Sequence, residues 1–227
     1  MVVAIVGILA ALAVSFMPRF TRRAGLRSST FDLIAAIQLA KTQSAQAGRD
    51  VVLVVMGPAG DPANCTRSVR NPDCVRWWML EDVVANAGTP ECKAAVDCLP
   101  FSAATLAAFD PANPSAGGPD AGGDLVVDSG ALDRSVTLGR PAGAPATLGR
   151  PLANVDLSRA CSFCTATAPL RGYVKFASDG TASLSALAAG RSGGAVFLEG
   201  GSETDEWRGI AITVPAGIVS TRLWAMR

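Results

Sequence analysis

The sequence predicts an α+β protein in which a long N-terminal helix, partly transmembrane, packs on a mainly antiparallel β-sheet head. Residues 1–17 carry no charged side chain, and residues 28–48 space apolar side chains three and four positions apart, as amphipathic helices do. Later apolar segments are short, rich in β-branched residues and bounded by turn-forming residues, as strands are. We therefore divide the chain into an apolar helix over 1–27, an amphipathic helix over 28–48 and a β-rich head over 49–227.

The composition excludes several classes of function. Hydrophobic residues make up 49% of the 227 positions and charged residues 17%, so the chain folds or lies in lipid rather than remaining disordered. The net charge of +1 gives the chain as a whole no electrostatic footprint for nucleic acid. The absence of histidine removes Ser-His-Asp and Cys-His catalysis and histidine zinc sites. We expect neither an enzyme nor a protein with a bound metal or cofactor.

The apolar run over 1–17 is the most informative segment. As a helix it would be about 25 Å long, slightly short of the roughly 30 Å hydrocarbon core of a bilayer. Its basic residues follow the run, and the positive-inside rule would place that flank in the cytoplasm. The basic cluster consists of Arg19, Arg22, Arg23 and Arg27. We assign membrane insertion to the helix residues Val2, Val3, Ile5, Gly7, Ile8, Leu9, Leu12 and Val14.

The six cysteines form three couples that are local in the sequence. Such couples indicate disulfides formed in an oxidising compartment, which conflicts with a cytoplasmic flank. The last couple has two other interpretations, a thioredoxin-like redox pair or part of a four-cysteine zinc site. No βαβ pattern surrounds it, and the spacing of the other couples does not suit zinc knuckles. The couples are Cys65 with Cys74, Cys92 with Cys98, and Cys161 with Cys164.

The segment 28–48 has the pattern of a helix that lies on a sheet. Ser29 can cap its N-terminus, and Gly48 can end it. The spacing of its apolar side chains predicts one face that packs on the core. That face consists of Phe31, Leu33, Ile34, Ile37, Ala40 and Lys41.

The strands of the head follow. Residues 50–56 read as a buried strand and residues 75–85 as its antiparallel partner, joined by a long turn that a Cys65–Cys74 bond would close. Residues 87–160 are rich in Gly and Pro and form a loop-rich insertion with a few short strands, such as 125–127. Two copies of the pentapeptide TLGRP lie in it, at 137–141 and 147–151. Further strands are expected at 172–177, 195–199, 207–214 and 217–224.

Several of these segments resemble known proteins. Ala4, Ile5 and Gly7, followed by Ile8, Leu9 and Ala10, match the N-terminal helix of type IV pilins and type II secretion pseudopilins. Residues 31–45, followed by Val51, Val52 and Leu53, are similar to the passage from leucine-rich helix to first strand in GspH/FimT minor pilins. The order of the last strands, with its Phe-x-x-Asp-Gly turn, is also similar. The middle of the chain carries no such likeness.

The resemblance implies a structural subunit of a type II secretion pseudopilus or a type IV pilus, in the tip complex. Its partners would be other pilins or pseudopilins, which it contacts through the N-terminal helix, so the resemblance adds a role in subunit assembly to the residues that we assign to membrane insertion. It would be a single-pass protein of the bacterial inner membrane with a periplasmic head before it joins the filament. Family members carry a basic leader upstream of this helix, so we expect an in-frame extension before Met1 with the leader, the cleavage and methylation site and a glutamate. That extension would reconcile the basic flank with exported cysteines.

An alternative function is DNA binding during natural transformation. Some FimT-type minor pilins bind DNA through a basic C-terminal tail with a Gly-Arg-x-Arg motif, which this chain lacks. The candidate DNA contacts that it retains are Arg222 and Arg227, on either side of Trp224. We favour an edge strand with solvated ends for this tail and a structural role for the chain.

Overall fold

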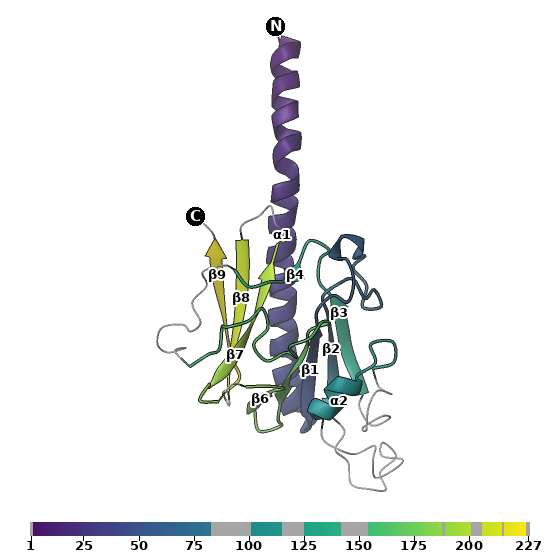
Figure 1. The fold of residues 1–227 in the computed structure, drawn as a ribbon, viewed down its shortest axis with the longest axis vertical. Helices are drawn as coiled ribbons and strands as arrows, with labels where there is room; N and C mark the ends of the chain where they lie inside the picture. Colours follow the sequence, from purple (N-terminus) through teal and green to yellow (C-terminus); the bar gives the residue numbers. More distant parts are fainter. Residues whose placement is uncertain are drawn as a thin grey trace.

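The computed structural model describes residues 2–82, 101–114, 125–141, 154–187, 189–200, 206–214 and 216–225. For residues 2–16, 18 and 220–225 it describes the backbone. It is an α+β fold with an N-terminal helix and two antiparallel sheets (Figure 1). Its elements are α1 (Val2–Ala47), β1 (Asp50–Met56), a 3-10 turn (Pro62–Asn64), β2 (Arg76–Asp82), α2 (Ala103–Ala108), β3 (Leu125–Ala131), β4 (Thr137–Leu138), β5 (Arg171–Phe176), β6 (Ala182–Leu184), β7 (Gly193–Glu199), β8 (Glu206–Thr213) and β9 (Ile218–Ala225).

The two predicted helical segments form one continuous helix, α1. Gly48 follows it with a φ of 64°, the left-handed conformation that glycine adopts at helix C-termini, as predicted. The prediction that Ser29 caps a helix is wrong. Ser29 is buried inside α1, where its Oγ accepts a hydrogen bond from the backbone N–H of Asp133 at 2.9 Å. A serine inside a helix can serve a tertiary contact in this way, because its own backbone is already satisfied.

The five-stranded sheet has the order β3-β2-β1-β5-β6, with every neighbouring pair antiparallel. The predicted pairing of β1 with β2 is confirmed, in a register that places Val52 opposite Leu80. Side chains of β1 alternate between two apolar clusters: Leu53 and Val55 face α1, while Val54 faces the opposite cluster under α2. Both faces of β1 are therefore buried, which explains its uninterrupted apolar run.

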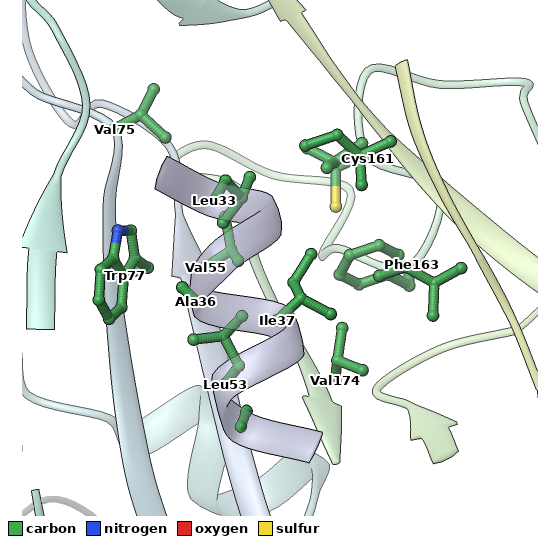
Figure 2. Close-up of a cluster of buried hydrophobic side chains, with 14 of the residues drawn as sticks. Leu33, Ala36, Ile37, Leu53, Val55, Val75, Trp77, Cys161, Phe163 and Val174 are labelled. Atoms are coloured by element: carbon green, nitrogen blue, oxygen red, sulfur yellow. The ribbon is translucent and has the colours of Figure 1, made fainter. Parts of the chain in front are cut away.

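The four-stranded sheet has the order β4-β7-β8-β9 and contains the predicted C-terminal strands. Val196 of β7 and Ile210 of β8 lie in the same core cluster as the apolar side chains of α1. The C-terminal half of α1 lies alongside both sheets (Figure 1). Figure 2 shows Leu33 and Ile37 of the helix among side chains from β1, with Trp77 on one side and Phe163 on the other.

The insertion over 87–160 contains regular structure in its described parts. The expected short strand at 125–127 is confirmed as the start of β3, an edge of the five-stranded sheet. The first TLGRP copy supplies β4, which pairs with β7, and the second copy lies outside the described residues. The short helix α2 begins with a capping box between Ser102 and Thr105. Its Leu106 and the adjacent Phe109 cover the outer face of the five-stranded sheet.

Two of the three predicted disulfides are present. The Cys65–Cys74 bond closes the turn between β1 and β2, and the Cys161–Cys164 bond closes a loop in the main core. All four cysteines are buried, and no free cysteine occurs in the described part of the chain. Cys92 and Cys98 lie outside the described residues, so their bond stays a prediction.

Candidate assembly surface

The helix α1 has two environments along its length. Its N-terminal half projects beyond the head, and its C-terminal half is packed against both sheets (Figure 1). Leu26 is the first buried residue among the described side chains of the helix. Gly25 marks the exit point, because a Cβ there would lie 2.7 Å from Ser135 Oγ in a loop that touches the helix. At 1.5 Å per residue, residues 2–25 span about 36 Å.

Large apolar side chains are exposed on α1, and together they form what we term the apolar stripe: Met17, Phe20, Phe31 and Leu39. Phe20 is 75% exposed and Phe31 60%. Since successive helix residues turn by about 100°, the four positions fall within an arc of about 100°. The middle of that arc lies opposite Leu26 and Leu33, which are buried. The helix therefore presents apolar side chains on two opposite faces, one to the core and one to the outside.

The position of Phe31 corrects a prediction. We expected Phe31 to pack on the core together with Leu33 and Ile37, but only the latter two are buried. The residues Phe31 and Leu33 are two positions apart and thus about 200° apart around the helix. One face cannot include both, and Leu33 is continued at the three- and four-residue spacing by Ala36, Ile37 and Ala40, all of them buried.

A groove runs beside the apolar stripe, between α1 and the edge strand β3. It has a volume of about 850 Å³ and is lined by Ala35 and Leu39 of α1, Trp77 of β2 and residues 128–131. Asp32 and Arg67, which form an ion pair, lie at the same groove. The C-terminal end of the apolar stripe, at Leu39, is therefore continuous with this groove, which side chains of another molecule can enter.

The basic cluster surrounds the point where the helix leaves the head. Arg23 Nε lies 3.2 Å from Glu206 Oε1, so an ion pair joins the helix to the start of β8. Both side chains retain solvent access, and exposed pairs of this kind contribute about 0.2–1 kcal/mol. Arg19 and Arg27 are exposed. One arginine of the cluster thus contributes to fixing the direction of the helix relative to the second sheet.

The remaining predicted site residues lie at the two ends of the chain. The backbone of the assembly residues between Val2 and Val14 lies in the projecting half of α1. The structure does not describe their side chains. The candidate DNA contact Arg222 belongs to β9 by its backbone, where it is opposite Gly209. Its side chain and all of Arg227 are likewise outside the described residues. Their roles stay predictions.

A charged group that the sequence analysis did not identify lies inside the five-stranded sheet. Lys175 Nζ of β5 is 2.6 Å from Asp82 Oδ2 of β2 and 2.9 Å from Asp50 Oδ2 of β1. Burial alone would lower the pKa of Lys175, but hydrogen bonds to Asp82 and Asp50 outweigh it and the pKa is raised. Burial has the opposite effect on the neighbouring Tyr173, whose pKa it raises. Because it joins three adjacent strands, we assign this ion triad a structural role.

Other chemistry is limited in the described part of the chain. No group of three or more His, Cys, Asp or Glu side chains lies close enough there to hold a metal ion. The Cys161–Cys164 pair is oxidised and buried, each residue being 2% exposed. Among the residues that the structure describes together with their side chains, no helix is both long enough and apolar enough to cross a membrane. The chain matches no family model, no curated protein sequence and no solved structure.

Proposed function

We propose that this chain is a structural minor pilin or pseudopilin of the GspH/FimT type, which assembles into a filament through α1. The observation that carries the proposal is the division of this helix. Its C-terminal half is buried on one face by the head and its N-terminal half projects. The outward face of both halves carries the apolar stripe. A helix built in this way leaves apolar surface for neighbouring helices to cover.

The energetics favour a partner on that surface. Covering a large apolar side chain stabilises by about 1.5–3 kcal/mol, so a helix with several exposed ones gains from association. Phe20 and Met17 lie near the exit point, and the uncharged run over 1–17 continues the helix beyond them. In lipid the same side chains would be satisfied by acyl chains, and in a filament by neighbouring helices.

The finer parts of the proposal follow from the sequence resemblance. The helix would anchor the chain in the inner membrane before assembly, with the head in the periplasm. An oxidising compartment is supported by the two disulfides. The partners would be other pilins or pseudopilins, and the place of the subunit would be the tip complex. The chain would have no catalytic activity of its own.

The proposal is tested by photo-crosslinking in the bacterium that produces the chain. A photoreactive phenylalanine analogue at Phe20 should form adducts with pilin-like subunits, because this side chain points away from the head. The matched position is Ala63, which is exposed on the turn between β1 and β2 and should give no such adducts. Adducts from Ala63 alone, or none from Phe20 in assembled filaments, would contradict the assignment.

A pair of substitutions separates assembly from folding. Phe20→Asp places a charge on the apolar stripe and should abolish recovery of the chain in the sheared filament fraction. Phe20→Leu keeps an apolar side chain and should leave recovery within about twofold of the wild type. Since Phe20 is 75% exposed, both variants should unfold in urea like the wild type.

A further inference from the structure

A cavity on the outer side of the five-stranded sheet is lined by three arginines. It has a volume of about 510 Å³ and lies at the end of β1, where Met56 forms part of its wall. The three arginines come from three segments: Arg70 from the turn before β2, Arg76 from β2 and Arg171 from β5. One acidic side chain, Asp110, lines the same cavity. The walls therefore carry a formal charge of about +2 near neutral pH.

Arg76 is the most deeply buried of the three, with 3% of its surface exposed. Its Nη1 donates to the carbonyl of Val69 at 3.4 Å, its Nη2 contacts Met56 Sδ at 3.3 Å, and its guanidinium lies over the ring of Trp78. Its Nε is buried and has no hydrogen-bond partner. In the described part of the chain, no carboxylate forms an ion pair with Arg76. A buried guanidinium with an unused donor gains strongly when an anion reaches it.

The other charged side chains do not supply that anion. Arg171 Nη1 donates to the carbonyls of Ala107 and Phe109, both at 3.3 Å, which fixes this arginine at the end of α2. The Oδ1 of Asp110 accepts a hydrogen bond from the backbone N–H of Ala112, two residues further along the chain, at 2.9 Å. Burial first, and then the charge of Arg171, lower the pKa of Arg76, and the opposing effect of the Asp73 charge is smaller than the two together.

We propose that this cavity is a binding site for an oxyanion, a carboxylate or phosphate group that the three arginines hold between them. Planar guanidinium donors suit both groups, and donors that converge from three segments fix an anion in place rather than attracting it loosely. The apolar wall at Met56 and Pro169 would contact the carbon skeleton of a ligand that bears such a group. The inference does not depend on the proposed role in a filament.

The test is an anion titration of the full chain in detergent, at constant ionic strength balanced with sodium chloride. The probes are inorganic phosphate and succinate, and the readouts are thermal unfolding and calorimetry. For ligands of so few atoms we expect a dissociation constant of about 1 mM for the better probe. The order of the two affinities identifies the group. Equal stabilisation by chloride alone, or no binding at about 20 mM of either probe, would overturn the proposal.

Variants locate the site. Arg171→Gln should weaken binding about tenfold, and Arg70→Gln about threefold because Arg70 is exposed. Asp110→Asn removes the opposing charge but keeps the acceptor for Ala112, so it should tighten binding about threefold. The control is Arg134→Gln, an exposed arginine that does not line the cavity. Binding that is unchanged in both Arg70→Gln and Arg171→Gln would exclude this cavity as the site.

Discussion

The two halves of α1 are built from similar residues but lie in opposite environments. Phe20 in the projecting half is 75% exposed, whereas Leu33 in the packed half is 1% exposed. Even within the packed half, Leu39 is 46% exposed although it is six residues from Leu33. The apolar character of a position on this helix therefore does not show its role, because the helix has one face for the head and another for a partner. Direction around the helix decides between folding and association.

The sharpest test of this comparison uses one substitution at two positions. Leu33→Ala removes a side chain from the core between the sheets and should lower the free energy of unfolding by about 3–5 kcal/mol. Leu39→Ala, on the apolar stripe, should change it by less than about 1 kcal/mol. Urea unfolding of the full chain in detergent measures both. Equal losses at the two positions would mean that the outward face is also part of the folded core.

A second test extends the comparison to charged groups. Lys175→Met leaves Asp82, whose side chain is 0% exposed, without its cation, and should cost about 2–3 kcal/mol. The matched pair lies at the exit of the helix, where Arg23→Gln removes an exposed ion pair and should cost under about 1 kcal/mol. Urea unfolding at neutral pH decides the order. A larger loss for Arg23→Gln would reverse our assignment of the structural ion pair.

The pH dependence of the same triad has a defined sign. The pKa of Lys175 is raised by Asp82 and Asp50, so its contribution to stability is complete below the unfolded lysine pKa of about 10.4. The contribution is lost as the pH rises further, through the folded pKa. In Lys175→Met this loss above about pH 10.4 should be smaller. The raised pKa of Tyr173 destabilises the folded state in a similar range, so Tyr173→Phe is the control.

The disulfide near the helix gives a smaller effect. Cys65–Cys74 closes the turn that carries Arg67, and Arg67 donates to the carbonyl of Ala131 and pairs with Asp32 on α1. Replacing both cysteines by Ala should cost about 2 kcal/mol, because the bond closes a short loop. A matched Arg67→Gln variant should cost under about 1 kcal/mol. Losses of the same size would mean that the ion pair, rather than the bond, holds the turn in place.

How far the sequence predicted these features depends on the kind of signal. The strands β1, β2 and β5 follow from β-branched runs and turn residues, because those are local properties. The outward position of Phe31 follows from helix geometry once Leu33 and Ile37 define the buried face, so the sequence carried that signal. The absence of a cap at Ser29 depends on the loop at Asp133, which is distant in the sequence. The arginine cavity also escapes sequence reasoning, since Arg76 and Arg171 come together only through the register of the five-stranded sheet, where each lies opposite Met56.

The smallest expected effect concerns DNA. If the C-terminal tail were a DNA receptor, duplex binding would fall steeply with salt and would be lost in the Arg222→Ala/Arg227→Ala variant, because neutralised phosphates release counterions. With two tail charges on a chain of net charge +1, we expect no affinity tighter than about 10 μM at physiological salt. The matched variant is Arg19→Ala/Arg27→Ala, which removes two exposed charges from α1, one on each side of the exit point. An anisotropy titration should show the same weak binding for the wild type and both variants. Submicromolar affinity that disappears only in the tail variant would transfer the function from the helix to β9, and the apolar stripe would then need a different explanation.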